Sequence, residues 1–176
     1  MGSRRLSKNR VAALLKKLVG AKIDLGKSTI LHKRPVEALT NAAAVTRTLK
    51  AQESGTLFTV NLATVDNNIT LTLPTASTSA GVFFDFCVLA NSDDDADLVI
   101  TTGNNATDIY GGIITLDANS TVDAFNGISK ITVDGSVAQS SEGLRLSLLC
   151  DGTNWHLSGH IATAVGTVHL VGSASA

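Results

Sequence analysis

The residues best suited to chemistry in this sequence are its histidines, at His32, His156, His160 and His169. Residues Trp155–Ile161 alternate as a strand does, which would place His156, Ser158 and His160 on one face, opposite the apolar side chains. Two histidines on one strand face can ligate a metal, but the spacing supplies no third ligand. We therefore expect these two histidines to face solvent or a subunit contact, and we expect no metal site.

Nucleophilic catalysis has little support in the sequence. The G-x-S-x-G pattern, which places a serine on a nucleophile elbow, does not occur. A Ser-His-Asp triad can be assembled from residues that are distant in sequence, so this alternative stays open. Because no spacing identifies its members, the sequence predicts no catalytic residue, and we expect the protein not to be an enzyme.

Two further patterns match ligand sites only in part. Asp93-Asp94-Asp95 with Asp97 could offer carboxylates to calcium, but the EF-hand glycine and terminal glutamate are missing. Gly26-Lys27-Ser28 resembles the end of a phosphate-binding loop, whose first glycine would fall on Ala21. We interpret the acidic cluster as a solvated loop, with cation binding left open, and we reject the phosphate loop. No cofactor is predicted.

The two cysteines, Cys87 and Cys150, lie in apolar runs that are typical of strands. A free cysteine packs as a small apolar residue, and no pattern indicates an oxidising compartment. We expect two buried thiols and leave their redox state open.

The charges divide the chain into two parts of opposite sign. Residues 1–50 hold 12 Lys or Arg and 2 acids, whereas residues 51–176 hold 2 bases and 13 acids, so the net charges are +10 and −11. Such asymmetry is typical of a basic arm that meets an acidic partner, either nucleic acid or an acidic protein surface. The acidic part repels phosphate, so any nucleic-acid contact is expected on the arm alone. No apolar run is long enough to cross a membrane.

Residues 1–35 are predicted to form a basic N-terminal arm with one short amphipathic helix. Ser7 can cap this helix, Gly20 can end it, and apolar residues recur from Val11 with helical spacing. A helix of about 12 residues is marginal alone in water, so we expect its apolar stripe to lie on a partner. The residues expected to bind the partner are Arg4, Arg5, Arg10, Val11, Leu14, Leu15, Lys16, Lys17, Leu18, Lys22, Lys33 and Arg34.

Residues 36–176 are predicted to form an acidic all-β body. Thr, Val and Ile supply 45 of the 176 residues, and β-branched side chains suit pleated sheets. Short strands that recur with turns between them indicate a β-sandwich or a jelly-roll-like barrel of about 8–11 strands. The expected strands are 42–51, whose start could also be helical, 56–62, 68–73, 82–90, 97–102, 109–116, 120–125, 128–134, 144–151, 153–161 and 165–171.

Two local predictions follow from the same patterns. The nearly continuous apolar run Val82–Leu89 is expected to be a central strand that is buried on both faces. The dipeptide Asp151-Gly152 is typical of a tight turn, so we expect Cys150 and Trp155 to belong to one hairpin.

Several of these stretches resemble β-modules in virion structural proteins of tailed bacteriophages. They read ESGTLFTVN at Glu53–Asn61, ITLTLP at Ile69–Pro74, GVFFDF at Gly81–Phe86 and CDGTNWHLSG at Cys150–Gly159. The resemblance covers about residues 45–161, leaves out the arm, and includes no catalytic signature. Modules of this kind occur in capsid decoration (cement) proteins and in head- or tail-fibre proteins.

The resemblance implies a non-enzymatic capsid decoration protein that stabilises the phage head through its N-terminal arm. The partner would be the major capsid protein or another virion protein, and the protein would be located in the virion, assembled in the bacterial cytoplasm. The alternative is a fibre or tail-adaptor protein. A third is a carbohydrate-binding or hydrolase module, for which Trp155 and Tyr110 are the plausible exposed aromatics. The composition, rich in Thr, Ser and Ala, favours a homo-oligomer, with a trimer as the expected state.

We predict that residues 1–35 are disordered in the isolated protein and ordered on the partner. They carry ten bases and one acid, and their short helix would have no core of its own to join. Limited proteolysis of the free and the partner-bound protein measures this. Equal protection of the arm in both states would contradict the prediction.

Overall fold

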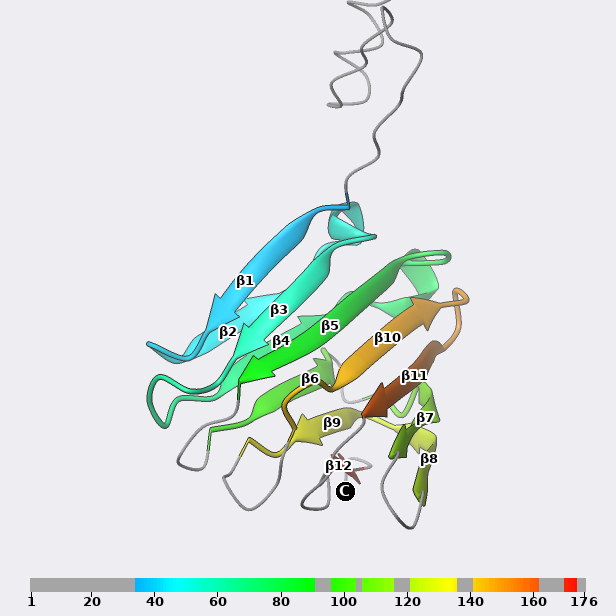
Figure 1. Cartoon of the computed structure of the whole chain (residues 1–176). Coiled ribbons are helices and arrows are strands. Elements are labelled where there is room, and N and C mark those ends of the chain that lie inside the picture. The colour runs from blue at the N-terminus through cyan, green and yellow to red at the C-terminus, as the bar shows by residue number, and fades with distance from the viewer. Residues whose placement is uncertain are drawn as a thin grey trace, which may run out of the picture. The chain divides into compact units, whose positions relative to one another are not determined.

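The computed structural model describes residues 34–90, 96–103, 106–115, 121–135, 141–161 and 170–173 (Figure 1). The chain divides into two compact units, residues 1–33 and 34–176. Only the second unit contains described residues, so the predicted arm helix lies outside them.

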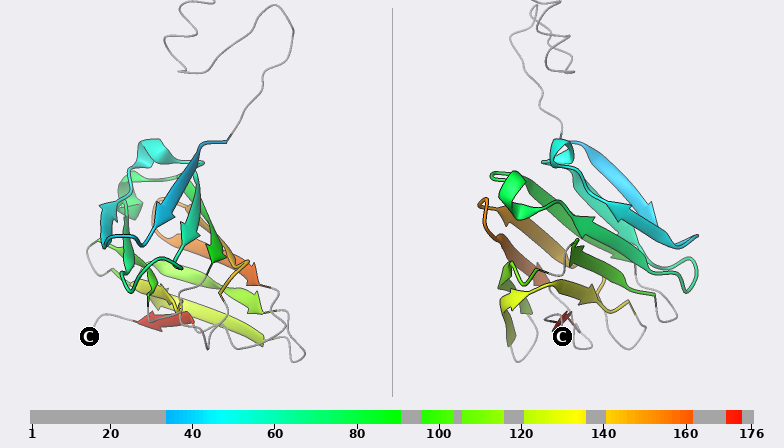
Figure 2. Two further views of the ribbon diagram at one scale, coloured as in Figure 1. Left: turned by 60° about the vertical axis from the view of Figure 1, so that its left-hand side comes forward. Right: turned by 180° about the vertical axis from the view of Figure 1, so that it is seen from behind.

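The described residues form two mixed β-sheets. The larger sheet has the order β1 (Val36–Thr40), β3 (Leu57–Asn61), β5 (Phe83–Ala90), β10 (Arg145–Cys150), β11 (Trp155–Ile161), β7 (Ile109–Thr115) and β8 (Thr121–Ile128). The smaller sheet has the order β12 (Leu170–Ser173), β9 (Lys130–Val133), β6 (Leu98–Thr102), β4 (Ile69–Leu73) and β2 (Val45–Thr48). Two short 3₁₀ helices, η1 (Ala51–Glu53) and η2 (Ala76–Thr78), join strands of the two sheets. The all-β prediction is confirmed, and of the two arrangements predicted the sandwich is observed (Figure 2).

The first six strands alternate between the two sheets. β1, β3 and β5 are therefore parallel neighbours in the larger sheet, and β2, β4 and β6 are parallel neighbours in the smaller one. The later strands add antiparallel pairs, including β10 with β5 and β11, and β6 with β9. Because each connection passes from one layer to the other, consecutive strands face each other across the core that the two sheets enclose.

The core consists of the inward-facing side chains of both sheets. In β4, Ile69, Leu71 and Leu73 are buried and the threonines between them are not, as the two-residue period of a strand requires. The larger sheet contributes the aromatic rings. Phe58 and Phe86 stack with their centroids 5.4 Å apart. Such pairs add to the free energy that is gained by burying apolar area.

The prediction that Val82–Leu89 is buried on both faces is wrong. Phe83 and Leu89 are 42% and 51% exposed, because a two-layer sandwich covers only one face of each sheet. Cys87 shares their face and is only partly buried, so the expectation of two buried thiols holds for Cys150 alone. Both cysteines are free.

Two strands near the start of the folded unit also differ from the expectation. The predicted strand 42–51 is shorter, since β2 spans Val45–Thr48 and a 3₁₀ turn follows at Ala51–Glu53. The strand Val36–Thr40 was not predicted at all. By contrast, the predicted hairpin is confirmed, because Cys150 pairs with Trp155 across the loop that contains Gly152.

An arginine connects the two sheets at one edge of the sandwich. Arg47 on β2 donates hydrogen bonds to Glu37 on β1 and to Glu53, the last residue of η1. Its guanidinium also lies 5.7 Å from the centroid of the Phe58 ring. The ion pairs and the cation–π contact hold the two edge strands over the aromatic core.

We predict that two glycines, both with a positive φ, differ sharply in their tolerance of alanine. Gly111 in β7 has a φ of +124°, and a Cβ there would lie 2.0 Å from the carbonyl oxygen of Leu157 on the neighbouring β11. Gly81 has a φ of +79°, but nothing lies within 4 Å of its Cβ position. Gly81→Ala should therefore cost only the left-handed backbone strain of about 1–2 kcal/mol. Gly111→Ala must also separate two strands, so we expect a loss of about 3 kcal/mol or more.

Urea unfolding of both variants and the unaltered protein measures the two costs. Equal losses would show that the close approach of β7 to β11 does not limit position 111.

Candidate functional site

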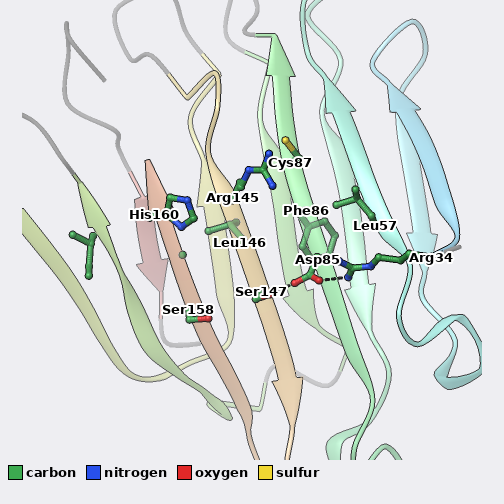
Figure 3. A pocket seen from close by; sticks show the side chains of 12 residues that line it. Arg34, Leu57, Asp85, Phe86, Cys87, Arg145, Leu146, Ser147, Ser158 and His160 are labelled. Atoms are coloured by element: carbon green, nitrogen blue, oxygen red, sulfur yellow. Dashed lines mark hydrogen bonds and ion pairs between the residues drawn. The ribbon is translucent and has the colours of Figure 1, made fainter. Parts of the chain in front are cut away.

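The outer face of the larger sheet contains a hollow of about 440 Å³ (Figure 3). Side chains from β3, β5, β10, β11 and β7 line it, together with Arg34, which precedes β1. We take it as the candidate site.

The strand register builds this hollow from two adjacent rows of side chains. The first, which we call the serine row, consists of Leu57, Asp85, Ser147 and Ser158. The second, which we call the arginine row, consists of Cys87, Arg145, His160 and Ile114. Neighbouring strands lie about 4.8 Å apart, so each member of a row borders the next.

Arg34 is held against the serine row by three contacts. Its guanidinium forms an ion pair with Asp85, and its Nε donates a hydrogen bond to the carbonyl oxygen of Gly55 at 2.7 Å. The guanidinium also lies 5.8 Å from the centroid of the Phe83 ring. Ser147 Oγ donates to the other oxygen of Asp85. Both oxygens of Asp85, the one carboxylate among the lining residues, therefore accept hydrogen bonds, and Arg34 compensates its charge.

The arginine row offers a cation beside apolar surface. Arg145 forms no ion pair within the described residues, and Figure 3 shows it between His160 and Cys87. Ile114, at the end of the row, is 48% exposed. A guanidinium without an ion pair to any described residue, next to an exposed aliphatic side chain, suits a ligand or protein surface that presents a carboxylate.

The hollow does not bring a cysteine and a histidine together as a catalytic pair. Cys87 and His160 both line it, but Arg145 separates them by two strand spacings, about 10 Å. A thiol and the base that activates it must approach to about 3 Å. Cys87 and His160 are thus not arranged as a thiol and its activating base.

The face predicted for the histidines of β11 is confirmed. His156, Ser158 and His160 point outward, opposite buried Trp155 and Leu157. The other two histidines, His32 and His169, lie outside the described residues.

His156 forms a small polar cluster with the loop before it. Its Nε2 lies 2.8 Å from Asp151 Oδ2, and Asp151 Oδ1 accepts hydrogen bonds from the backbone N–H groups of Thr153 and Asn154. The hydrogen bonds from His156 and from these two amides lower the pKa of Asp151 to about 2. The cluster stabilises the loop of the β10–β11 hairpin and leaves the hollow untouched.

The other two candidate ligand sites, the acidic cluster and Gly26-Lys27-Ser28, lie mostly or wholly outside the described residues. Asp93, Asp94 and Asp95 lie outside them, and the backbone N–H of Asp97 donates to Asn68 Oδ1 at 2.8 Å. Within the described ranges, no group of three or more His, Cys, Asp or Glu is placed to hold a metal ion. Nor does that part of the chain contain a helix of the length and apolarity that a membrane span requires.

The structure describes only one of the residues that we expected to bind a partner. Arg34 lies on the larger sheet, where it contacts Asp85. The remainder lie outside the described residues: Arg4, Arg5, Arg10, Val11, Leu14, Leu15, Lys16, Lys17, Leu18, Lys22 and Lys33.

The aromatic residues proposed for sugar binding are not both available. Trp155 is fully buried, where its ring stacks on Phe84 at 5.9 Å between centroids. Tyr110 is half-buried. The expectation that Trp155 could be exposed is wrong because its strand position faces the core.

Sequence reasoning missed the hollow itself. Its parts come from five strands that are spread from Leu57 to His160, and only the pairing of those strands brings them together. The available signal was the alternation of Phe83, Asp85 and Cys87 with Phe84 and Phe86, which indicates two distinct faces.

The bonds of Asp151 predict a specific dependence of stability on pH. Folding lowers the pKa of this carboxyl from 3.8 to about 2, so its ionised form stabilises the fold above the unfolded pKa. Asp151→Asn keeps an oxygen for the two amides and removes the charge. We expect the stability gap between the two proteins to be constant down to about pH 5 and to shrink between about pH 4 and pH 2.

Urea unfolding at a series of pH values measures this gap. Glu142→Gln, which removes an exposed carboxylate outside the cluster, is the control. A gap for Asp151→Asn that persists unchanged to pH 2 would contradict the assignment.

Comparison with known proteins returned no relative: no protein-family model, no curated protein and no solved structure matches the chain.

Proposed function

We propose that this protein is a non-enzymatic structural protein of a tailed-phage virion, a capsid decoration protein attached through its basic N-terminal arm. One observation carries the proposal. Residues 34–176 form a unit with its own core and hold 5 bases against 14 acids, whereas residues 1–33 hold 9 bases and 1 acid. The basic segment thus differs in charge from the folded unit, and we infer that it is the part of the chain that binds a partner.

The division of charge suits attachment to a large assembly. The net negative charge of the body favours solubility before attachment. The basic arm can approach an acidic surface and bury its apolar residues there. A protein that binds the assembled shell and not its separate subunits stabilises the shell by mass action, by about 2.7 kcal/mol per site at 100 times its dissociation constant.

The phage class is supported by the resemblance of residues 45–161 to virion β-modules. A fibre or tail-adaptor protein would use the same body and arm and would differ in where the arm binds. The sugar-binding alternative loses support because Trp155 is buried in the core.

We predict that the apolar stripe of the arm contributes more to attachment than its charge. Each fully buried leucine contributes about 1.5–3 kcal/mol, whereas an exposed ion pair contributes about 0–1 kcal/mol. The double variant Leu14→Ala with Leu18→Ala should therefore detach from virions at ordinary salt. Lys16→Gln with Lys17→Gln should mainly slow association and reduce its salt dependence, because long-range charge steers encounter.

Occupancy on purified virions across a salt series compares the two double variants, which both change residues between positions 14 and 18. If the lysine variant detaches while the leucine variant stays bound, the arm is an electrostatic tether and the proposed clamp is wrong.

A further inference from the structure

The exposed apolar side chains of the body gather on one face. Among the described residues, the large apolar side chains that are exposed are Val36, Val65, Phe83, Leu89, Ile114 and Leu149. All of them except Val65 belong to strands of the larger sheet and point away from its core. Phe83 and Leu149 are direct cross-strand neighbours, so their exposed surfaces are continuous.

The outer face of the smaller sheet has a different character. Its outward positions on β2 and β4 are all threonine, at Thr46, Thr48, Thr70 and Thr72. A threonine can bond to water through its hydroxyl, whereas a phenylalanine or leucine cannot. Among the described residues, the large apolar side chains that are exposed on a sheet all belong to the larger one.

The charges that the described residues place on this face are mostly basic. They are Arg34, Arg145 and Asp85, and Asp85 is paired with Arg34. The body as a whole holds 5 bases and 14 acids, a net charge of −9. A surface that complements this face must combine apolar groups with negative charge, and a second copy of the body supplies that charge.

We propose that the outer face of the larger sheet is the contact between copies of this chain, in a head-to-tail arrangement. Leu149, Phe83 and Ile114 of one copy pack on the next, and Arg145 pairs with a carboxylate there. Such a contact between two different surfaces forms a closed ring when the rotation between copies closes.

The size of the face is adequate for this role. Seven strands about 4.8 Å apart, each about 20 Å long, present on the order of 600 Å². Stable interfaces bury about 800 Å² of accessible surface per partner. The projected area of the sheet is smaller than its accessible surface, because it does not count the sides of protruding side chains.

This inference is independent of the proposed attachment to a capsid, because it concerns the full-length protein alone in solution. Sedimentation velocity over a range of concentrations should show an oligomer. Leu149→Asp and Ile114→Asp each place a carboxylate on the face, at side chains that are 50% and 48% exposed. Each should weaken self-association by about tenfold or more, the equivalent of one buried aliphatic side chain.

Val65→Asp is the matched control, since Val65 is 43% exposed and lies off the face, in the loop between β3 and β4. It should associate as the unaltered protein does. Arg145→Gln should weaken association at low salt and have less effect at high salt, because screening removes the contribution of the charge. Circular dichroism and thermal unfolding verify that each variant is folded.

Cys87 provides a second readout in the middle of the same face. It is partly exposed, whereas Cys150 is buried and serves as an internal reference. Alkylation of Cys87 should be slow in the assembled protein and faster in Leu149→Asp, with no change at Cys150.

Several outcomes would overturn the inference. If the protein is still monomeric at about 100 μM, which is about 100 times a micromolar dissociation constant, it forms no such contact. An oligomer that survives both aspartate substitutions uses another surface. Equal dissociation by Val65→Asp would show that added charge, and not this face, controls assembly.

Discussion

The fold depends on burying one chain of aromatic rings between its two sheets. Phe86 stacks on Phe58, Phe58 lies 6.1 Å from Phe84, and Phe84 stacks on Trp155, so the rings form a continuous series across the larger sheet. All four are at most 1% exposed. Their burial fixes which face of β3, β5 and β11 turns inward. A shift of one residue in any of these strands would move its ring into solvent.

The inward rings also determine the outer surface. Because side chains alternate along a strand, fixing Phe84 and Phe86 inward places Phe83, Asp85 and Cys87 outward. The register with β10 then sets Ser147 beside Asp85 and Arg145 beside Cys87. The hollow, its cations and the apolar surface around it are thus consequences of how the core is packed. The proposed contact between copies uses residues whose positions the core has already set.

Local patterns in the sequence predicted most of the strands and the β10–β11 hairpin. Alternation in Ile69–Leu73 and the Asp-Gly turn before Trp155 are short-range signals, and the structure contains both features. Composition could not predict the order of strands, because the alternation of β1 to β6 between layers depends on contacts between distant segments. The prediction that Val82–Leu89 is buried on both faces failed for a related reason. An apolar sequence shows what a strand can bury, while the number of layers decides what it does bury.

The candidate site was less predictable than the fold. Arg34 was selected for its charge, but its partner Asp85 lies 51 positions away and no spacing links them. Neither did any motif indicate that Arg145, His160 and Ile114 would meet, since strand pairing alone joins them. What the sequence does contain is the opposition between a basic N-terminal segment and an acidic body, on which the proposed function rests.

The most direct test of that function is an electron cryomicroscopy map of virions that contain this protein. The account predicts a β-sandwich on the outer surface of the capsid, with density for residues 1–33 running from Arg34 onto the capsid subunits. A body located on the tail would favour the fibre or adaptor alternative. Density for the basic segment on packaged nucleic acid would contradict the account.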